Sequence, residues 1–515
     1  MTEIIIPKNA AIKKNDRYWQ FGIGSCHLAL AQRADYLAQL EEAVKELGFK
    51  RVRCHGVFHE SMNLYQSAAE FMPLPAMDKY VTRSFFEIAK VYDSFLNRGV
   101  RPIVELGLMP KRLASGGRTL FKYKMNVTPP RRMTEWSALV KDFAAFLIDR
   151  YGKEEVSEWL FEVWNEPDFR FVFWTGTQKK YFELYAATAK ALKSVCPDLK
   201  VGGPVTTSGT WIKETVDYCR TKGVPLDFVS THLYPSGEVK VAEMAGGVIG
   251  RYMNVLKNAR KGLTARDGIH TLMYDAEQLK NYDAAETLRT VERIEREADG
   301  IPWYLTEWNA NATCTAPEHD TKAAAAYTVK TVLDAQGHMN GCVYWCLSDI
   351  FEELNHFPEP FSGSFGLMTV YGVKKPNYHA FRMLAETGAE RIILPETDGE
   401  IKAAAFTDGS EIQILLHRHC FVPADGKEKA AITVATQRAP LSVTVVKIDD
   451  EHCNATAAWR AVGSPAVPTE AQVREINALS APKEEPLPYK SVPNGIELTA
   501  ALGVNDVHFI KIKLN

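Results

Sequence analysis

The sequence predicts a (β/α)8 TIM barrel followed by a C-terminal β-sandwich. Up to about residue 385, eight short runs rich in β-branched and aromatic residues alternate with amphipathic helical stretches, a pattern typical of a parallel sheet wound with helices. Beyond that point, strand-like runs follow one another between turns. We therefore expect a barrel over residues 16–385 and an antiparallel sandwich over residues 386–515, with residues 1–15 as a candidate extra strand of the sandwich.

Eight runs are predicted as barrel strands. They are WQFGIG (19–24), RVRCHG (51–56), RPIVELGL (101–108), WLFEVWN (159–165), KVGGP (200–204), DFVSTHLY (227–234), PWYLTEWN (302–309) and GCVYWCLSD (341–349). Segments such as DYLAQLEEAVKELG between them repeat apolar residues at helical spacing and end at glycine. The count of eight depends on the short KVGGP run, so an open doubly wound sheet is the alternative.

The C-terminal region has the texture of an all-β domain. Its predicted strands include EIQILLHRH, LSVTVVKID and HFIKIKLN, and the run EIIIP near the N-terminus suits the same sandwich. Residues 463–493 contain six prolines and are predicted to be a loop-rich insertion.

Composition restricts the partners and the location. The formal net charge is −2, with 61 basic against 63 acidic residues, which gives no electrostatic footprint for nucleic acid or a membrane surface. No long apolar segment resembles a secretion signal or a membrane span. Nine cysteines show neither zinc-site nor disulfide spacing. We expect free thiols, a cytoplasmic location and a small neutral substrate.

Two glutamates occupy the ends of predicted strands. Asn165 and Glu166 close the fourth strand, where Pro167 has no backbone N–H for further pairing, and Glu307 closes the seventh. The ends of parallel strands form one face of a barrel, and strands three positions apart face each other across its mouth. Paired carboxylates there suit cleavage of a glycosidic bond, which needs neither metal nor cofactor.

These motifs carry a family resemblance. From about residue 20 to residue 385 the chain resembles glycoside hydrolase family 39, in its bacterial β-xylosidase branch, through RPIVELGLMPKRLASG, NVTPP, FEVWNEPDF, YLTEWN and YWCLSDIFEE. The resemblance implies a retaining mechanism with Glu166 as general acid/base and Glu307 as nucleophile. It also implies a barrel with a β-sandwich, and a homo-oligomer in several members.

Further residues are candidates for binding the sugar. Asn165 is expected to bond the 2-hydroxyl, His55 resembles the family's sugar-binding histidine, and Trp345 offers an aromatic face. His232 and Tyr234 lie at the end of the predicted sixth strand and are expected beside the nucleophile, although some xylosidases lack this tyrosine. In the acidic loop that contains Asp349, Glu352 and Glu353, the first candidate is Glu352.

Three charged residues fall in mid-strand, where inward-facing charges need partners. We predict that Arg53, Glu105 and Glu162 form a buried ion network beneath the site. The arginine would also lower the pKa of the nucleophile.

The expected function is an exo-acting, retaining β-D-xylosidase acting on short xylo-oligosaccharides. An α-L-iduronidase-like enzyme is the alternative within the family, and its charged substrate would need a cation such as Lys111, Arg112 or Arg170. Glucoside, galactoside and arabinoside specificities stay open, because one pocket contact decides among them. A non-catalytic sugar-binding barrel is the alternative from another class.

Overall fold

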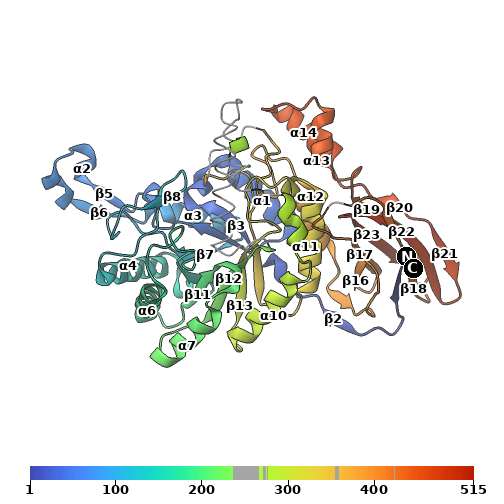
Figure 1. The fold of residues 1–515 in the computed structure, drawn as a ribbon, viewed down its shortest axis with the longest axis horizontal. Helices are drawn as coiled ribbons and strands as arrows, with labels where there is room; N and C mark the ends of the chain where they lie inside the picture. Colours follow the sequence, from blue (N-terminus) through green and yellow to red (C-terminus); the bar gives the residue numbers. More distant parts are fainter. Residues whose placement is uncertain (236–265, 269, 271–273, 275, 354–358, 423) are drawn as a thin grey trace.

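The computed structural model describes residues 1–235, 266–268, 270, 274, 276–353, 359–422 and 424–515. At its centre lies a closed barrel of parallel strands (Figure 1). In chain order the strands are β3 (Gly22–His27), β4 (Arg51–His55), β7 (Arg101–Leu106), β10 (Leu160–Val163), β11 (Lys200–Thr206), β12 (Phe228–Leu233), β13 (Trp303–Trp308) and β14 (Gly341–Tyr344). The predicted (β/α)8 barrel is confirmed, and the open sheet is wrong.

The barrel strands are buried on both faces. Every residue of β10, β12 and β14 is buried, because helices cover the outside of the barrel and side chains fill its interior. The eighth strand is shorter than predicted. It ends at Tyr344, and the residues up to 349 leave the barrel in an extended loop.

The first strand begins later than predicted. Tyr18–Phe21 form a short 3-10 helix, η1, and β3 starts only at Gly22. The Gln20 amide donates to the Leu47 carbonyl at 3.0 Å, and the Gln20 carbonyl accepts from the Lys50 N–H at 3.0 Å. These bonds tie the entering chain to the connection before β4.

Helices surround the barrel (Figure 1). The main ones are α1 (Ala34–Leu47), α3 (Phe86–Asn97), α4 (Met133–Tyr151), α6 (Gln178–Val195), α7 (Ile212–Lys222), α10 (Glu286–Ala298), α11 (Lys322–Asp334) and α12 (Pro376–Glu386), with the short α5 (Lys153–Val156) after α4. Gly48 follows the last residue of α1 and caps the helix, and its φ of 77° is a left-handed conformation that favours glycine. No helix among the described residues is both long enough and apolar enough to cross a membrane.

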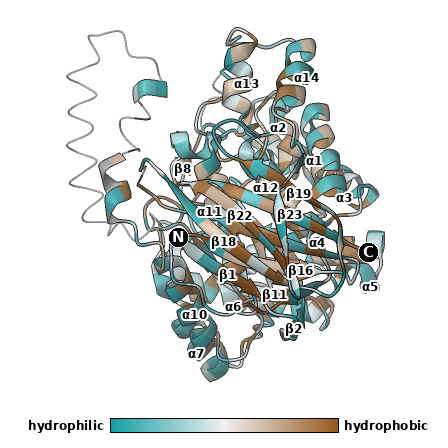
Figure 2. Cartoon of the chain, turned by 90° about the vertical axis from the view of Figure 1, so that its right-hand side faces the viewer, coloured by the Kyte–Doolittle hydropathy of each residue, from teal (hydrophilic) through white to brown (hydrophobic). Residues whose placement is uncertain are grey.

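Two sheets form one end of the molecule, beside the barrel (Figure 1). One has the order β1-β18-β22-β21 and the other the order β2-β15-β16-β17-β23-β19-β20. Their strands are β1 (Thr2–Ile6), β2 (Ile12–Lys14), β15 (Glu390–Ile392), β16 (Lys402–Thr407), β17 (Glu411–His417), β18 (Lys427–Ala435), β19 (Pro440–Ile448), β20 (Glu485–Pro486), β21 (Tyr489–Val492), β22 (Gly495–Gly503) and β23 (Val507–Leu514). The strands of this end are prominently hydrophobic in Figure 2, and apolar side chains from both sheets share one core.

The sandwich differs from the prediction in two ways. Strand β1 pairs with β18 in parallel, so the sheets are not purely antiparallel. The proline-rich insertion also contains a helix, α14 (Glu470–Leu479), which packs near α13 (Ala455–Ala461). A capping box between Thr469 and Gln472 starts α14 by satisfying backbone N–H groups at its first turn.

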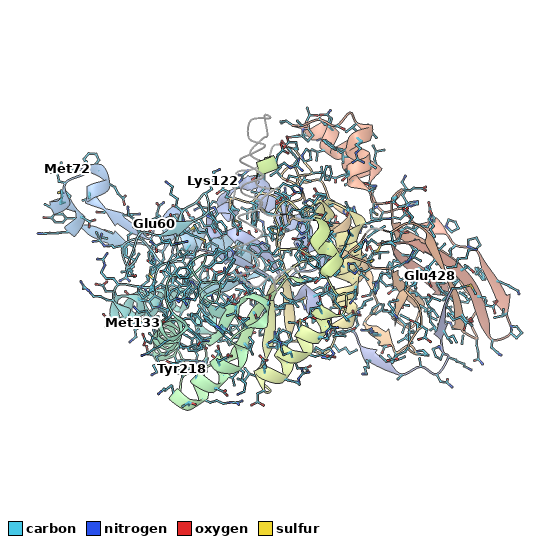
Figure 3. The ribbon with its side chains drawn as sticks, viewed as in Figure 1. Glu60, Met72, Lys122, Met133, Tyr218 and Glu428 are labelled. Atoms are coloured by element: carbon cyan, nitrogen blue, oxygen red, sulfur yellow. The ribbon has the colours of Figure 1, made fainter. Side chains whose placement is uncertain are left out.

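A hairpin arm projects from the barrel at the end far from the sandwich. Strands β5 (Tyr65–Ser67) and β6 (Val81–Arg83) pair at its base, and α2 (Ala68–Phe71) extends it. Figure 3 places Met72 near the tip of this arm. A second small hairpin, β8 (Thr119–Leu120) with β9 (Met125–Asn126), lies in the loop after β7.

Candidate active site

Both predicted carboxylates lie at the carboxyl end of the barrel. Glu307 is the fifth residue of β13, and Glu166 follows β10 in a tight turn. Trp164 and Glu166 have positive φ values of 75° and 45°, and the Glu166 N–H donates to the Val205 carbonyl at 2.8 Å. Left-handed conformations are rare for such residues and cluster at functional sites.

The two side chains are buried neighbours. One carboxylate oxygen of Glu166 and one of Glu307 lie within 4.8 Å of each other and of a ring nitrogen of His232. This spacing fits the roughly 5–5.5 Å of retaining glycosidase pairs better than the roughly 6.5–9.5 Å that inverting pairs leave for a water molecule.

Glu307 is surrounded by hydrogen-bond donors. Arg53 donates to its Oε1 at 2.6 Å and the Tyr234 hydroxyl to its Oε2 at 2.9 Å, while His55 Nε2 lies 3.6 Å from Oε1. Burial raises the pKa of Glu307, and these three groups act against that rise. Charged and hydrogen-bonding donors of this kind favour the carboxylate form.

Glu166 has a different environment. Its Oε1 lies 2.8 Å from His232 Nδ1. Burial and the nearby charges of Glu307 and Asp168 raise the pKa of Glu166 well above its usual value. Burial and Arg53 hold the pKa of His232 well below its usual value, so this imidazole is neutral. Burial thus raises the pKa of both carboxyls, but Glu307 has cationic and hydroxyl donors that oppose the rise and Glu166 has none comparable. This asymmetry is the arrangement that an acid and a nucleophile require.

The predicted ion network lies directly beneath Glu307. The Arg53 guanidinium contacts Glu162 at 2.6 Å and Glu105 at 2.9 Å, and it also donates to the Asn165 side-chain oxygen at 3.0 Å. All three charged side chains are fully buried. Because Arg53 bonds Glu307 as well, the network fixes the position of the carboxylate above it.

His55 stands on the same network. Its Nδ1 lies 2.6 Å from Glu105, and its ring centroid is 4.9 Å from that of Trp345. Burial alone would lower the pKa of His55, but Glu105 and Glu307 outweigh it and raise the value. Trp345 is buried apart from about 3% of its surface, so it lies in the wall of the site, directly after β14, rather than standing out as an exposed platform.

The two acidic loop residues take separate places. Glu352 Oε2 lies 2.7 Å from His27 Nε2. Glu353 turns toward the carboxylate cluster, with Oε1 4.0 Å from His55 Nε2. Burial raises the pKa of Glu353 to about 8, with His55 acting against this and Glu307 adding to it. Glu353 is thus nearer than Glu352 to the proposed nucleophile.

The sequence did not indicate the cluster of rings formed by Tyr123, His27 and His59. The Tyr123 ring stacks on His27 with centroids 4.4 Å apart, and His59 Nε2 bonds the Tyr123 carbonyl at 2.7 Å. Tyr123 comes from the loop after β7, and neither spacing nor motif in that loop indicates where its ring would lie.

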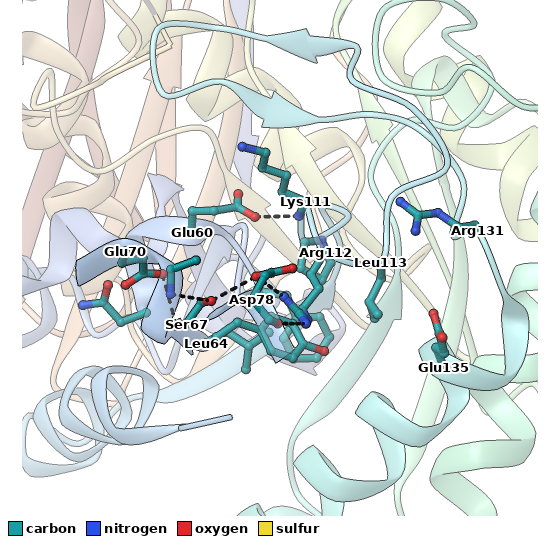
Figure 4. A pocket seen from close by; sticks show the side chains of 15 residues that line it. Glu60, Leu64, Ser67, Glu70, Asp78, Lys111, Arg112, Leu113, Arg131 and Glu135 are labelled. Atoms are coloured by element: carbon teal, nitrogen blue, oxygen red, sulfur yellow. Dashed lines mark hydrogen bonds and ion pairs between the residues drawn. The ribbon is translucent and has the colours of Figure 1, made fainter. Parts of the chain in front are cut away.

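Two of the three predicted cations line a cavity that does not include the carboxylate pair. Lys111 and Arg112 line a cavity of about 830 Å³ beside the arm (Figure 4), where Arg112 bonds Asp78 at 2.9 Å and Glu60 accepts from the Lys111 N–H. Neither Glu166 nor Glu307 lines this cavity. Arg170 lies over the ring of Phe171 at 5.2 Å.

A metal is not needed to explain the site. Glu166, His232 and Glu307 are close enough to share an ion, but both oxygens of Glu307 already accept hydrogen bonds from Arg53 and Tyr234. A second group of possible ligands, Asp449, Asp506 and His508, lies in the sandwich. Its carboxylates also have hydrogen-bond partners, since Asp506 bonds Lys322 and Asp449 bonds His452. We assign both groups as hydrogen-bonded clusters.

Comparison with known proteins agrees with this geometry. The family model of glycosyl hydrolases family 39 matches residues 2–245 and 264–494. The chain belongs to this family. Family 39 membership makes it a glycoside hydrolase with a retaining mechanism.

Two beta-xylosidases match this family 39 chain over nearly its full length. It is 35% identical to a beta-xylosidase of Caldicellulosiruptor saccharolyticus, over 98% of this chain and 96% of that one, and 31% identical to a beta-xylosidase of Geobacillus stearothermophilus, over 100% and 96%. Human alpha-L-iduronidase is 24% identical over 72% of this chain and 57% of its own length. The structure of a GH39 beta-xylosidase from Caulobacter crescentus superposes with a TM-score of 0.77, 28% identity and 99% coverage of both chains.

Proposed function

We propose that this family 39 protein is an exo-acting β-D-xylosidase that cleaves short xylo-oligosaccharides, with Glu166 as acid/base and Glu307 as nucleophile. One observation carries the proposal. Two buried carboxylates lie within 4.8 Å of each other, and a cation and a tyrosine hydroxyl bond one of them while a neutral imidazole bonds the other. The full-length similarity to beta-xylosidases supports the choice of sugar.

The reaction proceeds in two steps. In the first, the Glu307 carboxylate attacks the anomeric carbon while Glu166 gives its proton to the glycosidic oxygen, so the leaving sugar departs as an alcohol. In the second, the Glu166 carboxylate takes a proton from water as the water oxygen attacks the same carbon and releases Glu307. Two inversions leave the anomeric configuration unchanged.

The surrounding residues bind the sugar. Asn165 already accepts from Arg53 through its oxygen, which leaves its NH₂ group to donate to the 2-hydroxyl, a contact that strengthens in the transition state. His55, Trp345 and Glu352 are assigned to the remaining contacts, together with His232 and Tyr234 beside the catalytic pair. Glu353 joins this set because it points toward Glu307.

The alternative iduronidase-like function needs a cation for the substrate carboxylate. Arg112 is engaged with Asp78 outside the catalytic pair, and the iduronidase relative is more distant in sequence than the beta-xylosidases. Both observations favour a neutral sugar.

A cytoplasmic location accompanies the proposal. All nine cysteines are free thiols, and eight of them are buried, which is the usual state in a reducing compartment. Short xylo-oligosaccharides taken up by a cell are a natural substrate there.

The test is a panel of nitrophenyl glycosides with the wild-type protein and Glu307→Gln. The β-D-xyloside should be hydrolysed fastest, and Glu307→Gln should lose at least about 10³-fold in kcat because no nucleophile remains. Glu428→Gln, in the sandwich (Figure 3), is the control and should keep full activity. Sugar binding without hydrolysis would identify the non-catalytic barrel, and a faster iduronide or glucoside would transfer the assignment to that sugar.

A further inference from the structure

A second carboxylate lies two residues beyond the acid/base. Asp168 accepts hydrogen bonds from the Thr207 N–H at 3.0 Å, the Thr207 hydroxyl at 2.6 Å and the Thr210 hydroxyl at 2.5 Å. These donors lie on the turn after β11, 39 residues further along the chain. Asp168 therefore joins the turn that carries Glu166 to the turn at residues 207–210.

The two turns hold each other in unusual conformations. Glu166 has a φ of 45°, and its N–H donates at 2.8 Å to Val205, whose φ is 57°. Ser208 also has a positive φ, of 50°. Backbone of this kind is strained and persists only where its surroundings enforce it. The carboxylate of Asp168 supplies part of that enforcement.

The turn at residues 207–210 is itself anchored to the barrel. Arg293 of α10 donates at 2.9 Å to the carbonyls of Ser208 and Gly209, and the Gly209 N–H donates to the Thr231 hydroxyl at 3.1 Å. Thr231 is the residue before His232, which contacts Glu166. Asp168 thus couples the acid/base to a rigid support on two neighbouring elements.

Among the described residues, no Lys, Arg or His forms an ion pair with the Asp168 carboxylate. In the described part of the chain its carboxylate bonds only backbone N–H and hydroxyl groups, which stabilise the ionised form without cancelling its charge. Asp227, directly before β12, is a carboxylate whose charge is paired. It accepts from the Val201 N–H at 2.8 Å and also pairs with Lys193 at 2.8 Å.

We propose that Asp168 is a positioning residue of the catalytic site: it locks the turn that carries Glu166, and it places an uncompensated negative charge beside that acid. The inference rests on the proposed role of Glu166. Its two parts are separable, since a neutral substitute removes the charge while a changed threonine weakens the lock.

If the charge of Asp168 acts on Glu166, its removal should change the pH dependence of kcat/KM. The charged and titratable groups that act on Glu166, from the strands and loops packed around it, are Glu307, Asp168, Arg53, Glu353 and His232. Glu307, Asp168 and Glu353 raise the pKa of Glu166, Arg53 lowers it, and His232 is neutral. Glu166 must be protonated for the first step, so its pKa sets the basic limb of kcat/KM. Loss of one nearby negative charge lowers this pKa and moves the basic limb to lower pH.

The experiment compares three variants by their pH profiles on an aryl β-xyloside. Asp168→Asn should move the basic limb down by about 0.5–1.5 pH units, the range for a charge several ångströms away in a partly buried site. Asp227→Asn is the matched control, and its basic limb should stay in place. Thr207→Val keeps the charge but loses a bond of the lock. Its kcat should fall most on substrates with poor leaving groups, and its basic limb should not move down.

Each result decides the inference. An Asp168→Asn limb that coincides with wild type, or an equal shift in Asp227→Asn, would overturn it. Asp168→Ser removes the same charge with a smaller side chain and replaces the Asn variant if that protein does not fold. A wild-type protein without any activity on aryl β-xylosides would count against the proposed function instead, so the two failures are distinguishable.

Discussion

Removing the hydroxyl of Tyr234 tests how the proposed nucleophile, Glu307, is kept ionised. This hydroxyl donates to Glu307 Oε2 at 2.9 Å, and the tyrosine itself stays protonated because burial and the charge of Glu307 raise its pKa well above the usual value. Tyr234→Phe removes this one donor and leaves the Arg53 contact to the other oxygen intact.

The size of the effect follows from the type of bond. A hydrogen bond to a charged group contributes about 1.5–3 kcal/mol, and one pKa unit corresponds to about 1.36 kcal/mol. The pKa of Glu307 should therefore rise by about 1–2 units in the variant. Because Glu307 must be ionised to attack, the acidic limb of kcat/KM should move up by the same amount, and at a fixed pH on that limb the rate should fall about 10- to 100-fold.

The measurement is the pH profile of kcat/KM on an aryl β-xyloside, with folding checked by circular dichroism. Tyr151→Phe is a matched control, since the Tyr151 hydroxyl also bonds a carboxylate, Asp93, at 2.9 Å but on the outside of the barrel. An acidic limb within about 0.3 units of wild type for Tyr234→Phe would show that this bond does not control the nucleophile, and the reasoning would be refuted.

Three further predictions address the roles of the glutamates, the ion network and a buried histidine. Glu166→Ala should accumulate a covalent intermediate on an activated aryl glycoside and give a glycosyl azide of retained configuration with azide, whereas Glu307→Gly should give the inverted azide; NMR showing the opposite configurations would exchange the two roles. Arg53→Met should lower the free energy of unfolding in urea by about 3–5 kcal/mol, because it leaves three buried carboxylates without their cation, and a loss below about 1 kcal/mol would contradict this. Burial lowers the pKa of His417 to about 3, so the unfolded chain binds a proton near pH 6.5 that the native protein rejects. The stability that this histidine confers is present above that pH and is lost as the pH falls. His417→Gln should flatten the fall of the unfolding free energy between pH 6 and pH 4 by up to about 1.4 kcal/mol per unit, and an unchanged slope would contradict it.

The barrel was predictable because its strands are buried on both faces. Such strands appear in the sequence as short continuous apolar runs, and all eight were placed on that basis. The error at residues 19–21 has a local cause. Trp19 and Phe21 look like strand residues, but the Gln20 N–H bonds the Arg17 carbonyl at 2.9 Å in a 3-10 turn. The Gln20 side chain also bonds the Leu47 carbonyl, a long-range contact that no local pattern contains.

The missed helix in the C-terminal insertion had a readable signal. Thr469 and Gln472 stand three residues apart, as a capping box requires. The prolines that surround this stretch suggested a loop, yet Pro468 stands just before the cap, where it does not interrupt the helix.

The candidate site was predictable only as far as strand ends determine it. Glu166 and Glu307 meet because parallel strands end on one rim. Which of Glu352 and Glu353 faces the cluster was not predictable, since residues 345–353 leave the sheet and have no regular alternation. The bond between Asp168 and the turn at residues 207–210 likewise depends on how two loops pack.

The buried charges explain how two glutamates so close together can take the two different roles that the proposed mechanism needs. Arg53 is in direct contact with Glu105, Glu162 and Glu307, and Glu166 and Glu353 add further carboxyls to the same space. Repulsion among these groups favours a proton on one of them, and the donors decide which. Burial raises the pKa of both glutamates, but Arg53 and Tyr234 oppose the rise at Glu307, whereas Glu166 faces a neutral imidazole, so the proposed mechanism places the proton on Glu166. In the proposed mechanism Glu307 becomes an ester in the covalent intermediate, so its charge disappears and the pKa of Glu166 falls. The nucleophile's own reaction thereby converts the acid of the first step into the base of the second.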